Sequence, residues 1–266
     1  MKGRATMDAA ERLVLMDLNM QEMYREDARV MDGGFVVERA GLVMTGSPIG
    51  THFTNMVMPV RTVDAATVHT EATAVFSAAG LPWSVWTRAH ADAVLEAELA
   101  ERGFLELVTV PAMVLDPADV TSVSPPSDVV LRAVVDEADV AAYGRVMAEA
   151  WSVYGVDREA TAAHFVSADS LIAPTRWAVL AWRGDEPVAG AILYCSHDVG
   201  GIGWVGTVPE AHGRGYGAAV TSAVVEEGVR RGAYFLSLQA SPMGAPVYRR
   251  MGFTTPSQYR VFIARD

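Results

Sequence analysis

Residues 204–218 read WVGTVPEAHGRGYGA, an order in which a strand-like run passes into a glycine-rich turn and then into a helix. Glycines at positions 213, 215 and 217 free the backbone for dihedral angles that other residues avoid. The amides of such a turn, and those of the first helical turn, have no acceptors of their own and can converge on one anion. The stretch therefore predicts a phosphate-binding loop, although a plain strand-to-helix connection would use the same glycines.

The spacing of the glycines narrows the choice of ligand. Dinucleotide-binding loops follow the pattern G-x-G-x-x-G, and ATP-type loops end in Gly-Lys-Ser/Thr, but residues 212–217 read HGRGYG. A second segment, residues 239–253, reads QASPMGAPVYRRMGF and follows after one predicted helix and one predicted strand. Together the two segments resemble the coenzyme A loop, Gln/Arg-x-x-Gly-x-Gly/Ala, and the last signature, Ala-x-x-x-Tyr-x-x-x-Gly-Phe, of the GCN5-related N-acetyltransferase (GNAT) superfamily. His212 departs from the first position of that loop.

The resemblance implies acetyl-CoA as co-substrate, held mainly by backbone amides, and a strand end at 205–208 that splays from its neighbour to bind the pantetheine arm and the thioester oxygen. It implies that Tyr248 is the general acid towards the coenzyme sulfur, whereas packing near Phe253 would make the same tyrosine a core residue. Ser241 stands where many relatives have an asparagine. The residues that the resemblance assigns to the coenzyme are Val205, Gly206, Thr207, His212, Gly213, Arg214, Gly215, Tyr216, Gly217, Ala218 and Ser241.

The rest of the C-terminal half alternates between strands and helices. Helical patterns are predicted at 137–151, 158–171, 218–231 and 245–251. Strands are predicted from residue 129 and at 176–182, 187–195, 202–208, 234–238 and 258–264. This order of elements fits the resemblance, which covers residues 128–266.

The N-terminal half repeats the later part of this order. We expect a first helix at 8–30, strand-like runs at 35–44 and 53–60, a helix at 64–79, a strand at 83–87, a helix at 92–102 and a strand at 105–115. Met58-Pro59-Val60 aligns with Val208-Pro209-Glu210, and the Gly-Phe pair at 103–104 aligns with that at 252–253. The offsets of 150 and 149 indicate an internal duplication, or else a chance recurrence of common pairs. No glycine follows Pro59 before Asp64, so the first copy lacks the phosphate loop.

The resemblance, extended to the first half by the repeat, implies an α/β (mixed α+β) protein of two GNAT-like domains, each a twisted, mostly antiparallel sheet flanked by helices. The predicted boundaries are 1–115 for a degenerate GNAT-like domain, 116–127 for a linker and 128–266 for the acetyltransferase domain. The linker segment reads DPADVTSVSPPSD from Asp116 to Asp128, and its prolines and serines could equally form a long surface loop within one domain.

Composition excludes several classes of protein. The 266 residues include 32 acidic and 21 basic side chains, and the net charge of −11 disfavours binding to nucleic acid. One cysteine, Cys195, excludes an intrachain disulfide framework and fits a cytoplasmic location. The six histidines show no metal-ligand spacing, and no run is apolar enough for a membrane span.

The function that the resemblance implies is acetyl transfer from acetyl-CoA to a primary amine of a small molecule or peptide. The alternative is an acyl-CoA-binding regulatory or interaction module without turnover. Trp151 and Tyr154 would bind the amine by cation–π contact, or else pack in the core. The sequence identifies no general base, since Glu210 is expected to be a solvated surface carboxylate and His212 is expected to have a structural role. The sequence leaves a homodimer open.

Overall fold

The N-terminal half consists of a long first helix, five strands and two further helices. The computed structural model describes residues 7–265 of the chain. The elements of this half are α1 (Ala9–Val30), β1 (Phe35–Arg39), β2 (Leu42–Gly46), β3 (Met56–Pro59), α2 (Ala65–Val75), β4 (Ser84–Arg88), α3 (Ala93–Glu101) and β5 (Leu105–Leu115), with short 3-10 turns at Ser77–Ala79 and Pro117–Asp119.

The C-terminal half contains six strands and four helices. They are β6 (Val130–Ala133), α4 (Glu137–Ser152), α5 (Arg158–Ala162), β7 (Arg176–Arg183), β8 (Glu186–Ser196), β9 (Val199–Thr207), α6 (Tyr216–Arg230), β10 (Phe235–Gln239), α7 (Ala245–Arg250) and β11 (Thr254–Ile263), with 3-10 turns at Ala168–Ser170 and Pro209–Ala211.

All strands of the described residues belong to one sheet, in the order β1-β2-β3-β4-β11-β5-β10-β9-β8-β7-β6. The two halves repeat one pairing pattern. In the first, β1–β2 and β2–β3 are antiparallel and β3–β4 is parallel, and in the second β7–β8, β8–β9 and β9–β10 follow the same sequence of directions. Gly103 and Gly252 each follow a short helix with φ of 87° and 95°. The repeat inferred from the two aligned anchors is therefore also a structural repeat.

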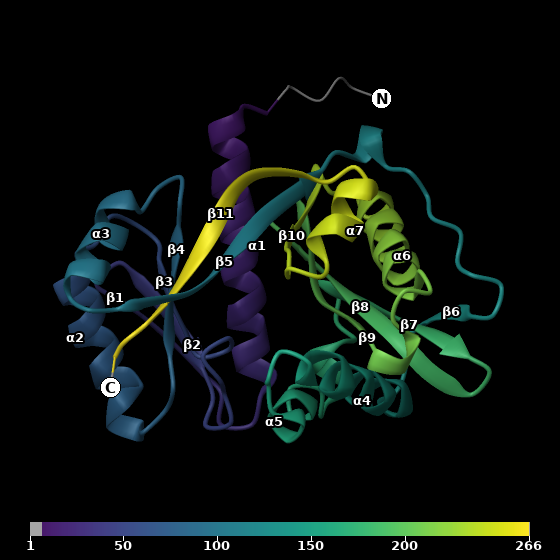
Figure 1. Cartoon of the computed structure of the whole chain (residues 1–266), viewed down its shortest axis with the longest axis horizontal. Helices are drawn as coiled ribbons and strands as arrows, with labels where there is room; N and C mark the ends of the chain where they lie inside the picture. Colours follow the sequence, from purple (N-terminus) through teal and green to yellow (C-terminus); the bar gives the residue numbers. More distant parts are fainter. Residues whose placement is uncertain (1–6, 266) are drawn as a thin grey trace.

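The last strands of the two halves are exchanged. Strand β5 of the first half pairs with β10 of the second, while β11, the last strand of the chain, pairs with β4 of the first half. The two exchanged strands also pair with each other over most of their length. They lie side by side across the centre of the molecule (Figure 1). The sheets of the two halves are consequently continuous.

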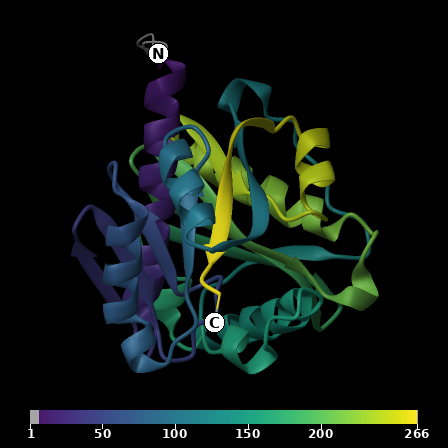
Figure 2. The same ribbon diagram turned by 60° about the vertical axis from the view of Figure 1, so that its left-hand side comes forward.

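Helices cover both faces of the sheet (Figure 2). In the C-terminal half, α6 packs on the face formed by residues such as Val179 and Leu193, and α4 packs on the opposite face, against Leu180 and Ile192. Helices α2 and α3 cover one face of the N-terminal half. Helix α1 runs along the middle of the other face, so it contacts β8 and β9 as well as β1 and β2 (Figure 1).

Two predicted elements are corrected. The helix expected over 158–171 ends at Ala162, because His164 and Phe165 turn their rings towards Trp204, at centroid distances of 5.0 and 5.2 Å, and this aromatic packing overrides the helical pattern. The run at 35–44 is two strands, since Ala40 and Gly41 take φ of 54° and 82° and form a tight hairpin turn.

The segment 116–127 lies against the C-terminal half. Val120 and Val123 pack against the hydrophobic cluster to which α6 contributes, and the Val123 amide donates to Ser222 Oγ at 2.9 Å. At its start, Asp116 forms an ion pair with Arg12 of α1. The predicted linker is thus held by specific contacts along its course.

Candidate active site

A cleft of about 410 Å³ opens between the start of α6, the end of β9, the start of α7 and the end of α4. Its size is within the range of small-molecule sites. The described residues that line it include Tyr248 and every residue assigned above to the coenzyme except Arg214. The other lining residues are Ala150, Trp151, Tyr154, Ala211, Met243, Gly244, Val247 and Arg250.

The loop before α6 has the backbone that its glycines suggested. Gly213 and Gly215 take φ of 76° and 85°, the left-handed region that favours glycine. A ring nitrogen of His212, Nε2, lies 2.9 Å from the carbonyl oxygen of Thr207 and, as the donor, ties the loop to the end of β9. A Cβ added at Gly217 would come within 3.3 Å of Thr207 Oγ1, so the helix start and the strand end approach closely.

The first turn of α6 has no capping side chain. Helices α1, α2, α4 and α5 each begin after an aspartate whose carboxylate accepts from a first-turn amide, whereas α6 begins after Gly215. The amides of residues 216–218 have no intrahelical acceptor, and these three residues line the cleft. Because a helix N-terminus also carries partial positive charge, this arrangement fits an anionic group such as a pyrophosphate.

The corresponding position of the N-terminal half is filled by the protein itself. Asp64 accepts from the Thr67 amide at 2.7 Å, and Glu98 of α3 accepts from the Ala65 amide at 2.8 Å. The hydrogen bond from Thr67 lowers the pKa of Asp64. Two carboxylates thus occupy the start of α2, where the C-terminal half leaves the amides open.

Strand β9 separates from β10 beside this loop. The parallel pairing runs from Val199 to Ile202, and residues 203–207 have no partner in β10. At the same place β9 carries a bulge against β8, in which Trp204 takes φ of 43°. Trp204 and Val205 stand opposite Ala191 in this bulge, and residues 205–207 line the cleft. Separation and bulge together leave backbone groups of this strand end available to a ligand.

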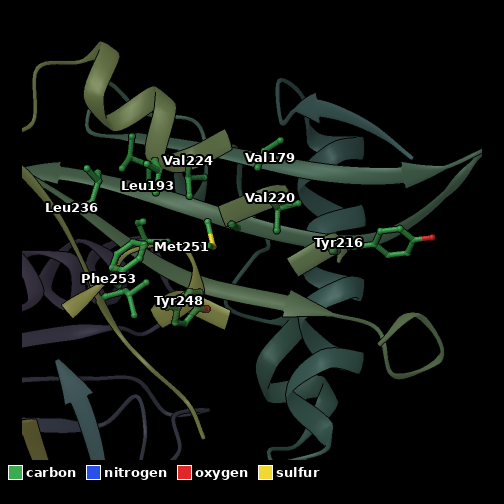
Figure 3. Close-up of a cluster of buried hydrophobic side chains, with 14 of the residues drawn as sticks. Val179, Leu193, Tyr216, Val220, Val224, Leu236, Tyr248, Met251 and Phe253 are labelled. Atoms are coloured by element: carbon green, nitrogen blue, oxygen red, sulfur yellow. The ribbon is translucent and has the colours of Figure 1, made fainter. Parts of the chain in front are cut away.

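Tyr248 lies on α7, lines the cleft, and belongs to the cluster of buried side chains drawn in Figure 3. Its ring is 8% exposed and lies 5.8 Å from that of Phe253. Burial raises the pKa of Tyr248 above its usual value near 10, so the phenol keeps its proton at neutral pH. A Cβ added at Gly244 would meet this ring at 2.8 Å, which makes Gly244 part of the wall that holds the tyrosine.

Three other predicted residues have particular positions. The Ser241 hydroxyl accepts from Tyr154 Oη at 3.0 Å and from the Gly244 amide at 3.1 Å. The Tyr216 side chain is buried and its phenol donates to Asp128, so its free amide is the group that faces the cleft. Arg214 is exposed and lies outside the cleft lining. The contacts of these residues with a ligand stay predictions.

The cleft offers no carboxylate base among its described lining residues, and Glu210 is exposed outside it. Within residues 7–265 no group of three or more His, Cys, Asp or Glu side chains is arranged to hold a metal ion. Cys195 is half-buried, and burial raises the pKa of its thiol. None of the helices described is long and apolar enough to cross a bilayer.

Sequence reasoning missed the residues that surround the bulge. Asp27 of α1 lies within 3.5 Å of Trp204 Nε1, and Tyr143 of α4 donates to the Trp204 carbonyl oxygen at 2.7 Å. Asp27 is separated from Trp204 by most of the chain, so no local pattern signals their contact.

Comparison with known proteins agrees with this geometry. Residues 141–253 match the model of the acetyltransferase (GNAT) family. A search of curated proteins found no significant match.

Solved structures with this fold span nearly the whole chain. A GCN5-related N-acetyltransferase from Kribbella flavida superposes with a TM-score of 0.74 and 19% identity, covering 98% of this chain and 97% of that one. A tandem GNAT protein from the clavulanic acid biosynthesis pathway superposes with a TM-score of 0.61 and 11% identity, covering 97% and 96%. The family match concerns residues 141–253, and the solved structures show that the chain shares their fold over nearly its whole length.

Proposed function

We propose that the protein is an acetyl-CoA-dependent N-acetyltransferase whose one coenzyme site lies in the C-terminal half. The observation that carries the proposal is the uncapped start of α6 behind two left-handed glycines, beside the separated end of β9. The match of residues 141–253 to the acetyltransferase (GNAT) family supports acetyl transfer in general. The identity of the acceptor and the roles of single residues are part of the proposal.

In this proposal the backbone binds the coenzyme. The amides of residues 216–218, with those of the loop before them, would hold the pyrophosphate at the helix N-terminus. The exposed Arg214 would add a charge-assisted contact from outside the cleft. The amides of Val205 and Thr207, which face away from β8, would bind the pantetheine arm and polarise the thioester oxygen as it gains negative charge. Because these contacts use backbone groups, the net charge of −11 does not oppose an anionic ligand.

The chemical step is an acyl transfer from sulfur to nitrogen. The amine nitrogen forms a bond to the thioester carbonyl carbon, the bond from that carbon to sulfur breaks, and its electron pair leaves on sulfur. Tyr248, which burial keeps protonated, would give its proton to this thiolate. The proton of the amine would go to water in the open cleft, since the described lining residues include no carboxylate.

We propose a primary amine of a small molecule or peptide as the acceptor. Trp151 and Tyr154 line the cleft at the end of α4, with ring centroids 5.6 Å apart. An aromatic wall of this kind attracts a cationic or apolar amine. A cytoplasmic location and a homodimer belong to the same proposal.

The direct test is thiol release from acetyl-CoA with a panel of primary amines, combined with a thermal shift on addition of coenzyme A. Release with one or more amines, and an acetylated product in the mass spectrum, supports the enzyme. A thermal shift without release from any amine supports the alternative of an acyl-CoA-binding module without turnover. Neither shift nor release contradicts both functions.

A further inference from the structure

Trp204 is the starting point, because it takes a backbone conformation that a bulky residue rarely adopts. Its φ of 43° lies in the left-handed region, and the residue forms the bulge in β9. A strained residue of this kind persists only when its surroundings fix it, and such residues gather at functional sites. Val205 follows it at the cleft, so the bulge sets the direction of the amides that the proposed function assigns to the thioester.

The C-terminal half fixes the backbone and the ring face of Trp204. Tyr143 Oη donates to its carbonyl oxygen at 2.7 Å. The rings of Trp151, His164 and Phe165 surround the indole at centroid distances of 5.3, 5.0 and 5.2 Å. These contacts leave the indole Nε1 donor to be satisfied.

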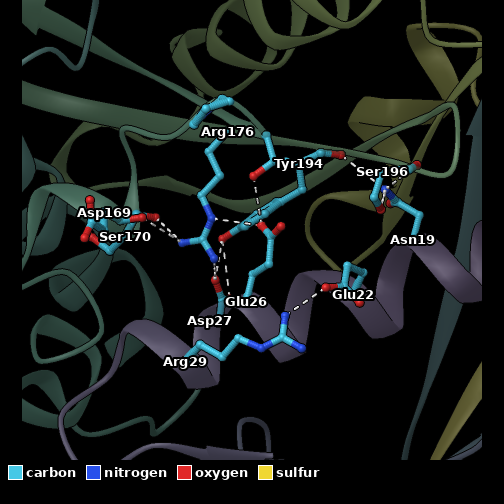
Figure 4. A network of polar contacts seen from close by, with 12 residues as sticks. Asn19, Glu22, Glu26, Asp27, Arg29, Asp169, Ser170, Arg176, Tyr194 and Ser196 are labelled. Atoms are coloured by element: carbon cyan, nitrogen blue, oxygen red, sulfur yellow. Dashed lines mark hydrogen bonds and ion pairs between the residues drawn. The ribbon is translucent and has the colours of Figure 1, made fainter.

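The acceptor for this donor comes from the N-terminal half. Asp27 Oδ2 lies 3.5 Å from Trp204 Nε1, and Asp27 itself is 7% exposed. The same carboxylate accepts from Tyr194 Oη at 3.2 Å and pairs with Arg176 at 3.3 Å (Figure 4). Arg176 also lies 3.3 Å from Glu26 and donates to the Ser170 carbonyl oxygen at 2.6 Å. Asp27 is thus fixed from several sides by donors of the C-terminal half.

We propose that Asp27 is a positioning residue for acyl transfer, which holds Trp204 in the β9 bulge and so aims the amides of residues 205 and 207, which face away from β8, at the reacting thioester. The inference rests on the proposed function for the chemistry that it serves. Under this proposal, helix α1 of the N-terminal half contributes directly to the active site of the C-terminal half.

The groups that face Asp27 or Trp204 predict how the contact depends on pH. Burial, opposed by Arg176, raises the pKa of Asp27 to about 6. Burial lowers the pKa of His164 to about 4, so this ring stays neutral while Asp27 titrates. The titratable or charged groups around the contact are Tyr24 and Glu26 on α1, Tyr143 on α4, His164 after α5, Arg176 on β7 and Tyr194 on β8. A change in the environment of Trp204 near pH 6 would therefore report Asp27.

The test compares Asp27→Asn with Glu26→Gln. Both variants remove one carboxylate charge from neighbouring residues of α1 that face Arg176, but only Asp27 contacts Trp204. In the wild type, the donors around Asp27 share its two carboxylate oxygens. An asparagine offers them only one acceptor oxygen, and its NH₂ group faces another donor, with which it forms no hydrogen bond. Trp204→Phe removes the same hydrogen bond from the other partner and serves where Asp27→Asn does not fold.

Two readouts are measured for each variant. The first is kcat with acetyl-CoA and a reactive amine, together with the Kd for coenzyme A. The second is the fluorescence of Trp204 between pH 4 and 8, taken as the difference between the protein and its Trp204→Phe variant. We expect kcat to fall about tenfold in Asp27→Asn, with a Kd for coenzyme A within about threefold, and both constants to stay within about twofold in Glu26→Gln.

The fluorescence change near pH 6 should be present in the wild type and in Glu26→Gln and absent in Asp27→Asn. Equal kcat in both charge variants, or a Trp204 signal that titrates alike in both, would overturn the role of Asp27 while leaving the acetyltransferase in place. A wild type that neither turns over nor binds coenzyme A would instead refute the proposed function. In that case the Trp204 signal still decides whether Asp27 holds the bulge.

Discussion

Replacement of Gly213 by alanine isolates the contribution of the loop backbone, because the structure supplies a matched control. Gly213 has φ of 76°, is exposed, and has no atom within 4 Å of an added Cβ. Gly184, in the turn between β7 and β8, has φ of 60°, is also exposed, and has the same open space. The two substitutions therefore impose the same kind of backbone strain and differ only in whether the cleft is nearby.

The expected magnitudes follow from this strain. An alanine in the left-handed region costs about 1–2 kcal/mol, and in Gly184→Ala the whole cost appears as lost stability. In Gly213→Ala the exposed loop can relax to other dihedral angles in the free protein and must return to the strained shape to bind a pyrophosphate. The same 1–2 kcal/mol then appears in binding, as a Kd for coenzyme A raised about 5- to 30-fold.

Isothermal titration with coenzyme A and thermal unfolding without ligand measure the two quantities separately. We expect Gly184→Ala to lower Tm with an unchanged Kd, and Gly213→Ala to raise the Kd. An equal Kd in both variants, with a similar loss of Tm, would refute the reasoning that the shape of this loop determines coenzyme binding. Loss of affinity for coenzyme A in Gly184→Ala alone would mean that the coenzyme does not bind at the start of α6.

Three further predictions concern single side chains. Tyr248→Phe should lower kcat about 100-fold at an unchanged Kd for coenzyme A, because it removes only the proton donor; unchanged turnover in steady-state assays would make Tyr248 a core residue. The raised pKa of Asp27, about 6 against a usual 3.8, means that this group contributes most stability below about pH 4 and that about 3 kcal/mol is lost as pH rises through 6. Denaturant unfolding should accordingly show the wild type losing stability relative to Asp27→Asn between pH 4 and 7, and a gain would contradict it. Asn19→Ala should lower the free energy of unfolding by about 1–3 kcal/mol. The reason is that Asn19 Nδ2, within the core, donates to Ser196 Oγ at 2.9 Å and to the Tyr194 carbonyl oxygen at 3.2 Å. A change near zero in the same denaturant assay would mean that water replaces the amide.

The part of the site that local sequence determines was predictable. The glycine spacing at 213–217 predicted a strand, a loop and a helix in this order. The prediction was possible because left-handed glycines and an uncapped helix start depend on only a few neighbouring residues. The repeat was visible for a similar reason. Gly103 and Gly252 end equivalent helices in the left-handed conformation, and this requirement preserves a local signature in both halves.

Long-range pairing was not predictable from these patterns. Strands β5 and β11 have the same alternation whether they pair within a half or across halves, so their exchange leaves no trace in either segment. The early end of α5 depends on the ring of Trp204, which is distant in the chain. The acceptor for Trp204 Nε1 comes from α1, at a separation of 177 residues. Each of these features is decided by partners that no window of sequence contains.

The two halves differ at their helix starts but share one sheet. Asp64 and Glu98 accept from first-turn amides of α2, so these amides have their acceptors within the chain. At the same time β4 supplies the neighbour of β11, and β5 supplies the neighbour of β10, the strand that separates from β9 at the cleft. Removing the first half would expose the edge of β10 and deprive β11 of both partners. The half without a loop is therefore part of the framework on which the loop of the other half depends.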